Sequence, residues 1–171
     1  MGVNRRRRLI DGGDAGGSRV KKPLNIPHHQ MDAWVLFVHA HARVMNRLAD
    51  DLDEAGEVPL GTYDVLVQLS LGGGKLRLKD LLSRVILSQP GLSRRVGRME
   101  EAGLVERRSD PKDGRGVIVA ITRAGRYALR SAAVVHMAGI DREFTADLTD
   151  EEAKVLARVF GRVVQPDEVR R

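Results

Sequence analysis

Residues 75–125 contain the sequence feature that most restricts the fold of this chain. Within this segment, apolar residues recur at the spacing of a helix in some stretches and alternate as in a strand in others. The sequence DPKDGRG, at residues 110–116, is dense in turn formers and predicts a hairpin. The expected elements are a short strand around Arg77, helices over residues 80–86 and 88–102, and strands over residues 104–108 and 117–121. This order predicts a winged helix-turn-helix.

Apolar helices are expected on both sides of this segment. Residues 31–54 carry a stripe at alternating spacings of four and three residues, namely Trp34, Val38, His41, Met45, Leu48 and Leu52. Phe37 and Val44 form a second apolar row, which predicts contact with both the home domain and a partner subunit. Residues 60–71 predict a short helix that ends at three glycines.

Two more helices are expected after the hairpin. Thr122 can cap one that runs to about Phe144, and Thr149 with Glu152 forms a capping-box pattern for another that ends near Val164. The predicted fold class is therefore mostly α with a small antiparallel β-wing, a winged helix-turn-helix with flanking dimerisation helices.

Charge is concentrated on the predicted winged segment. Residues 75–116 carry eleven basic and six acidic side chains, a net charge of +5, in a chain whose total is +6. Such a block fits a surface that binds a polyanion, although a solvated basic face is the alternative.

Other bulk properties exclude several classes of protein. No apolar run reaches about 18 residues, so no membrane span is expected. The absence of cysteine excludes disulfides and thiolate metal sites. The arginines at residues 5–8 are followed by Asp11 and not by an apolar stretch, so a cytoplasmic protein is predicted.

The helix over residues 88–102 has two different faces on a helical wheel. Leu92, Val96 and Met99 lie within about 40° of one another and form a core face. Arg94 and Arg98 lie on the far side together with Pro90 and Gly97, and Ser93 lies on the flank. Arginine suits bidentate contact with guanine or contact with phosphate, so this helix is the expected DNA-recognition helix. Gly97 would either permit close approach to DNA or be a tolerated surface glycine.

The hairpin tip has a similar character. Asp113 and Arg115 flank Gly114, and strand alternation would point both side chains to one face, where Asp113 could orient the guanidinium of Arg115. An arginine at this tip can enter a narrow minor groove. An ordinary exposed ion pair is the alternative.

These residues together resemble the MarR family of bacterial transcriptional regulators. The resemblance rests on residues 87–96 (LSQPGLSRRV), on residues 100–107 (EEAGLVER), and on the wing signature carried by Asp113, Arg115, Val119, Thr122 and Gly125. It spans about residues 31–164. Departures from the family pattern are Gly97, Met99, the basic N-terminal extension, and Gly116, which is expected to loosen the wing.

The resemblance implies a homodimer whose first and last helices interlock. Each recognition helix would enter a major groove of a pseudo-palindromic operator, and each wing an adjacent minor groove. It also implies a repressor that is released by a small aromatic carboxylate or phenol, bound between the dimerisation helices and the winged domain. The expected domains are a flexible basic tail (1–26), an N-terminal dimerisation helix (27–58), the DNA-binding domain (59–122) and C-terminal dimerisation helices (123–171).

We therefore predict two sets of site residues. The DNA-binding set is Ser88, Gln89, Pro90, Ser93, Arg94, Arg98, Arg77, Asp113 and Arg115. The ligand-binding set is Trp34, His41 and Tyr63, an aromatic wall with a polar handle, for which core packing is the alternative.

No enzyme, metal site or cofactor is predicted. Ser93 has no neighbouring histidine to act as a base, and His39 and His41 cannot share a helical face. The alternative function is a winged-helix interaction or architectural protein without a ligand response.

Overall fold

The computed structural model describes residues 25–85, 87–111 and 113–164, and of Arg115 it describes only the backbone. The predicted tail over residues 1–26 therefore lies almost wholly outside the described residues. The elements in chain order are α1 (His28–Glu54), α2 (Leu60–Leu71), β1 (Lys75–Arg77), α3 (Leu78–Leu82), α4 (Gln89–Glu101), β2 (Val105–Asp110), β3 (Asp113–Ile121), α5 (Arg123–Ile140), a π-helical turn (Asp141–Thr145) and α6 (Asp150–Val164). The predicted fold class is confirmed. None of the described helices combines the length and the apolar character that a membrane span requires.

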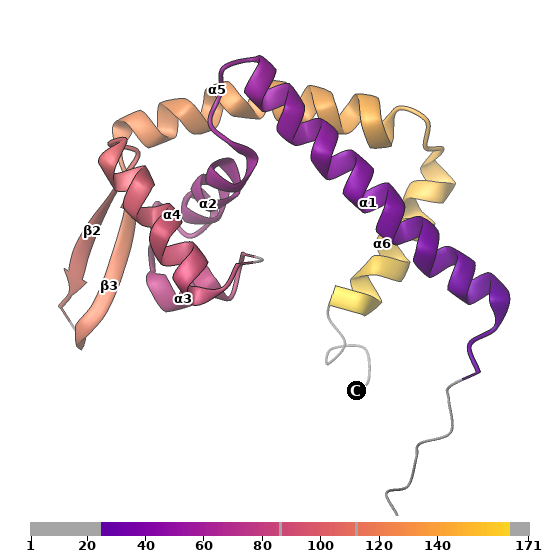
Figure 1. The fold of residues 1–171 in the computed structure, drawn as a ribbon, viewed down its shortest axis with the longest axis horizontal. Helices are drawn as coiled ribbons and strands as arrows, with labels where there is room; N and C mark the ends of the chain where they lie inside the picture. Colours follow the sequence, from indigo (N-terminus) through magenta and orange to yellow (C-terminus); the bar gives the residue numbers. More distant parts are fainter. Residues whose placement is uncertain (1–24, 86, 112, 165–171) are drawn as a thin grey trace, which may run out of the picture.

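The winged domain is built on a three-stranded antiparallel sheet in the order β1-β3-β2. Helices α2, α3 and α4 gather beside this sheet, and β2 and β3 project from it as the wing (Figure 1). One apolar core joins all of these elements, with Val65, Leu66, Leu69, Leu81, Val85, Leu92, Val96, Met99, Val105, Val119 and Ile121 at its centre. The aliphatic side chains that dominate this core explain how a chain with 4% aromatic residues folds.

Short-range capping signals set where three helices begin. The backbone N–H of Gly91 donates to Ser88 Oγ over 3.3 Å, and that of Gly125 donates to Thr122 Oγ1 over 3.0 Å. Thr149 and Glu152 form the predicted capping box, with Thr149 N donating to Glu152 Oε2 over 2.9 Å. These contacts satisfy N–H groups that a helix leaves unpaired in its first turn.

Two predicted boundaries were wrong. The helix expected over residues 80–86 begins and ends earlier, because α3 spans Leu78–Leu82, and Leu78 is therefore helical and not part of a strand. The loop expected over residues 110–116 is mostly strand, since β2 extends to Asp110 and β3 begins at Asp113. Turn-forming residues predicted a wide loop here, but ladder pairing continues to the tip with a register shift between Ser109 and Asp110.

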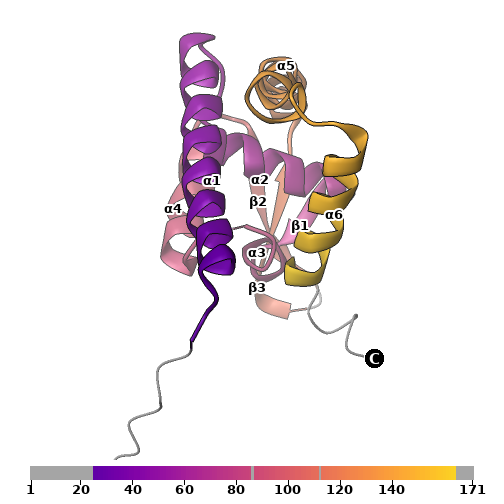
Figure 2. The ribbon, with the colours of Figure 1, turned by 90° about the vertical axis from the view of Figure 1, so that its right-hand side faces the viewer.

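The long helices form a second body beside the winged domain. Helix α5 crosses above the winged domain and meets the C-terminal part of α1 (Figure 1), and α1 and α6 descend from it on opposite sides (Figure 2). Leu48 and Leu52 are buried in the C-terminal part of α1, which packs against α5. A methyl group on Gly139 of α5 would lie 2.6 Å from Leu48 Cδ2. The N-terminal half of α1 is exposed instead, with Trp34 at 59% and Leu36 at 68%.

Replacement of Gly125 by alanine is expected to destabilise the fold. The new Cβ would lie 2.1 Å from the backbone oxygen of Leu104, where no flexible side chain can move aside. The free energy of unfolding should fall by about 1–3 kcal/mol, the usual cost of overpacking. Gly97→Ala is the matched control, because nothing lies within 4 Å of its Cβ and helix propensity alone should add up to about 1 kcal/mol. Urea unfolding of both variants measures the difference, and equal stabilities would contradict this account of the α5 N-terminus.

Candidate nucleic-acid interface

Helix α4 presents the two faces that the helical wheel predicted. Leu92, Val96 and Met99 are 1%, 1% and 2% exposed, so their side chains hold the helix in the core of the winged domain. The opposite side carries the exposed residues Arg94 and Arg98, and Ser93 is exposed on the flank. The assignment of core and outer faces is thus confirmed, whereas contact of the outer face with DNA stays a prediction.

The N-terminus of α4 is also open to solvent. Ser88, Gln89 and Pro90 are all exposed there, with the Ser88 side chain acting as the cap. A helix N-terminus carries unpaired N–H groups and a partial positive charge, both of which favour a phosphate. Gln89 also lines the cleft beside the wing, and contact of these three residues with DNA stays a prediction.

The C-terminus of α4 is tied to the wing by an ion pair that sequence analysis missed. Arg107 on β2 donates from its backbone N to Glu100 Oε1 over 2.9 Å and from its Nε to Oε2 over 2.7 Å. These hydrogen bonds lower the pKa of Glu100 and raise the pKa of Arg107. Both residues belong to the EEAGLVER segment, but only the turn at Gly103 brings them together. The pair links the last turn of α4 to β2.

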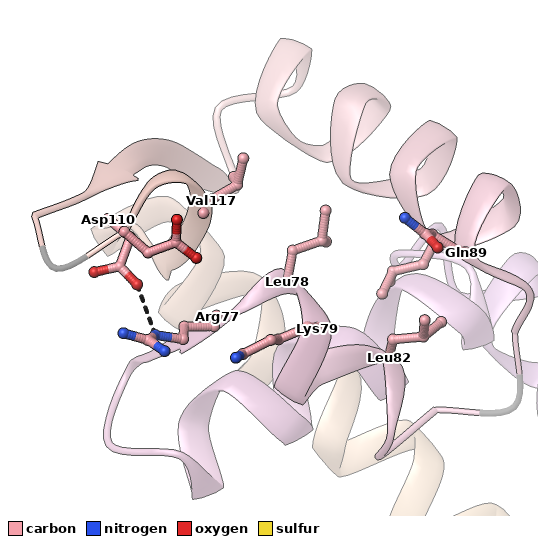
Figure 3. A pocket seen from close by; sticks show the side chains of 10 residues that line it. Arg77, Leu78, Lys79, Leu82, Gln89, Asp110 and Val117 are labelled. Carbon is pink, nitrogen blue, oxygen red and sulfur yellow. Dashed lines mark ion pairs between the residues drawn. The ribbon is translucent and has the colours of Figure 1, made fainter.

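The wing carries a buried carboxylate at its distal end, and this was also missed. The side chain of Asp110 is 3% exposed and its Oδ2 lies 2.7 Å from Arg77 Nε at the end of β1 (Figure 3). The predicted partner in this region was Asp113 for Arg115, but the side chain of Arg115 lies outside the described residues. Asp113 is exposed on β3 and lines the same cleft as Arg77.

The side chain of Arg77 does not extend freely into solvent, as a side chain awaiting DNA would. Its side chain is 33% exposed and engages Asp110, and it lines a cleft of about 280 Å³ between the wing and helices α3 and α4. Lys79 and Gln89 lie on the helical side of this cleft (Figure 3). Of the predicted DNA-binding residues, Arg77, Gln89 and Asp113 line this cleft, whereas Ser88, Pro90, Ser93, Arg94 and Arg98 do not.

Gly116 is packed tightly, contrary to the expectation that it loosens the wing. A methyl group at this position would lie 2.9 Å from Asp110 Cβ and 3.1 Å from the backbone oxygen of Asp113. The absence of a side chain thus lets the two strands close around Asp110.

A second concavity lies behind α4, between the winged domain and the long helices. It is an open groove of about 750 Å³ with mainly apolar walls from α1, α2 and α5. Polar side chains at its edges are Asp64, Arg84, Arg95 and His136. The ring of His136 lies 4.5 Å from that of Tyr63, centroid to centroid, and burial lowers the pKa of His136 and raises that of Tyr63.

Arg95 joins this groove to α4. Its guanidinium packs against the bare Cα of Gly61, where a methyl group would lie 2.2 Å from Nη1. Within the described part of the chain, the buried atoms Arg95 Nε and His136 Nδ1 have no hydrogen-bond partner. Arg95 Nε is a donor without an acceptor in the described structure, and His136 Nδ1 either donates or accepts, depending on the tautomer of the ring.

The predicted ligand-binding residues do not lie together. Tyr63 lines the groove, but Trp34 and His41 do not. Trp34 stacks near Phe37, and Phe37 contacts both His41 and Phe160 of α6, with ring centroids 5.3–6.2 Å apart. The stripe on α1 is continuous in sequence, but its two halves face different surroundings in the fold.

The fold and the interface define a winged helix-turn-helix protein. Residues 57–116 match the family model described as MarR family. The chain is 26% identical over 126 residues to the HTH-type transcriptional regulator YkoM of Bacillus subtilis, covering 74% of this chain and 80% of that protein.

Two solved structures from Streptomyces coelicolor are similar over most of their length. The MarR family transcriptional regulator AbsC has a TM-score of 0.76 at 27% identity, covering 83% of this chain and 96% of that one. Sco3205, a MarR family transcriptional regulator solved in complex with DNA, has a TM-score of 0.78 at 25% identity, covering 85% and 92%. The chain is thus similar in sequence and in fold to transcriptional regulators of the MarR family, which are not enzymes.

Gly97→Ala separates the two interpretations of the glycine on the outer face of α4. The added methyl group meets nothing within 4 Å in the protein, so the variant should be at least as stable as the wild type. If α4 approaches DNA closely at this turn, affinity for a cognate duplex should fall about tenfold, because the methyl group blocks one contact. Fluorescence anisotropy measures this affinity, and an unchanged value would identify Gly97 as a tolerated surface residue.

Proposed function

We propose that this chain is a MarR-family transcriptional regulator, a dimeric, sequence-specific repressor that acts on cytoplasmic DNA and is released by a small aromatic acid or phenol. The observation that carries the proposal is the outer face of α4, where Arg94 and Arg98 are exposed opposite a fully buried apolar face. Residues 59–122 form the DNA-binding domain in this proposal, and residues 27–58 and 123–171 form the dimerisation helices. The operator is a pseudo-palindrome, matching the twofold axis of the dimer.

Unpartnered apolar side chains support the dimer. Large apolar residues of α1 are exposed from Met31 to Met45, and none of the residues described for α6 is buried. Val155, Val159 and Val163 of α6 are 37–71% exposed. Contiguous apolar surface of this kind marks an interface, and a second copy of the chain presents the same two helices.

The groove behind α4 supports the ligand response. It combines apolar walls with the cationic groups of Arg84 and Arg95, which suits an aromatic ring that carries a negative charge. Arg95 belongs to the recognition helix itself. A ligand bound by Arg95 therefore acts directly on the orientation of α4.

Replacement of Arg94 by alanine tests the DNA-binding face. The change should weaken binding by about 1–3 kcal/mol and relax base preference at one position of each half-site, because a bidentate base contact is lost. Selection of duplexes from a random pool measures base preference, and anisotropy titration measures affinity. Sedimentation of the complex gives the number of chains per duplex, which should be two. Arg130→Ala, on the exposed side of α5, is the control.

Salt dependence completes this test. Wild-type affinity should fall with a slope of about −0.9 per phosphate contact in a plot of log affinity against log salt. Failure of the wild type to enrich any duplex at low salt would contradict the DNA-binding proposal and favour a winged-helix interaction protein.

Replacement of Arg95 by methionine tests the groove. Benzoate, used as the probe, should raise the melting temperature of the wild type and release bound duplex, with about 2.7 kcal/mol of stabilisation at one hundred times its Kd. Arg95→Met keeps the apolar stem but removes the charge, so both effects should be lost, while Arg130→Met should retain them. Phenol, which has the ring without the carboxylate, should bind both proteins equally. Wild-type benzoate affinity in Arg95→Met would exclude Arg95 as the anchor.

A further inference from the structure

The ion pair between Arg77 and Asp110 joins two parts of the winged domain that are 33 positions apart in sequence. Arg77 ends β1 and Asp110 ends β2, and Arg77 Nε lies 2.7 Å from Asp110 Oδ2. With 3% of its side chain exposed, Asp110 cannot reach into a groove of DNA. Any effect of Asp110 on DNA binding must therefore pass through the groups that it holds.

The wing strand folds around this carboxylate. Ladder pairs run regularly to Ser109 and Val117, and the next pair is Asp110 with Asp113. The register shift leaves residues 114–116 of β3 as a bulge. Gly116 closes the bulge onto Asp110, since a methyl group there would lie 3.3 Å from Asp110 Oδ2. The backbone of the bulge is thus packed directly against Asp110.

The same ion pair lies at the cleft that separates the wing from the recognition helix α4. The cleft of about 280 Å³ has Arg77 and Asp110 on one side and Gln89, at the start of α4, on the other (Figure 3). Asp113 and Gly116 also line it. A shift of Arg77 or of the bulge would change how far the wing tip lies from α4. Both must fit neighbouring grooves of one duplex if this protein binds DNA as proposed.

We propose that Asp110 is a positioning residue for DNA recognition, which through Arg77 and the bulge at residues 114–116 fixes the wing relative to α4. The inference rests on the proposed DNA-binding function. It also makes a prediction opposite to that of simple electrostatics. Loss of a negative charge beside a polyanion should strengthen binding, whereas loss of a positioning carboxylate should weaken it.

The test compares Asp110→Asn, Arg77→Gln and the double variant on the duplex that the wild type enriches from a random pool. Each single variant should lose roughly tenfold to a hundredfold in affinity, the range of one groove contact. The double variant should be no weaker than the weaker single variant, since both changes break one unit. Glu106→Gln is the matched control, because it removes an exposed carboxylate from the same strand and should leave affinity unchanged or raise it.

Hydroxyl-radical footprinting distinguishes positioning from general loss of structure. Asp110→Asn should lose protection at the outer minor-groove positions of the wings and keep the central protections of α4. Thermal unfolding confirms that each variant is folded at the assay temperature. Should Asp110→Asn fail to fold, Arg77→Lys and Gly116→Ala disturb the same contact while retaining the carboxylate, and the same footprint change is expected.

Four results separate failure of the inference from failure of the proposed function. Wild-type or higher affinity in the Asp110→Asn variant overturns the positioning role, and so does a uniform loss of the footprint. Additive losses in the double variant show that Arg77 contacts DNA independently of Asp110, and they also overturn it. A wild type that enriches no duplex overturns the DNA-binding proposal instead.

Discussion

Burial of one side of α4 is the constraint on which the rest of this molecule depends. Leu92, Val96 and Met99 pack into the core formed by α2, α3 and the sheet, and each is almost completely removed from solvent. Burial of such a side chain contributes about 1.5–3 kcal/mol, so rotation of α4 by even one residue would expose part of this surface at a large cost. The outward direction of Arg94 and Arg98 therefore follows from apolar packing and needs no polar contact of their own.

The remaining sides of α4 are controlled by contacts with other elements. Glu100 bonds to Arg107 on the wing, and Arg95 lies against Gly61 of α2 at the groove behind the helix. One helix thus contacts the core, the wing and the groove, and it leaves only its outer face to solvent. In the proposed regulator a ligand bound to Arg95 competes with the packing that holds α4. The ligand therefore acts on the DNA-binding helix directly and not through a series of other residues.

Much of this arrangement could be predicted from sequence because its signals are local. Ser88, Thr122 and the Thr149–Glu152 box are caps that act within one turn, and the face of α4 follows from the helical period. Asp110 was not predicted because its partner, Arg77, is brought near only by the pairing of β1 and β2 with β3. The local pattern of the DPKDGRG segment does not distinguish which charged residue is buried, and the fold places Asp110 against Arg77.

The stripe on α1 shows a different limit of sequence reasoning. Periodicity identifies an apolar face but not the body that covers it, so Trp34 and His41 were grouped with Tyr63 although only Tyr63 lines the groove. The covered half, around Leu48 and Leu52, packs α1 against α5, and the exposed half extends away from the winged domain (Figure 1).

Helix α1, with 27 residues, is about 40 Å long at 1.5 Å per residue. In the proposed dimer this length becomes a rigid spacer, because each α1 is anchored on its own winged domain and covered by the partner along its other half. The separation of the two α4 helices would then be set by helix geometry, which suits half-sites about 34–36 Å apart.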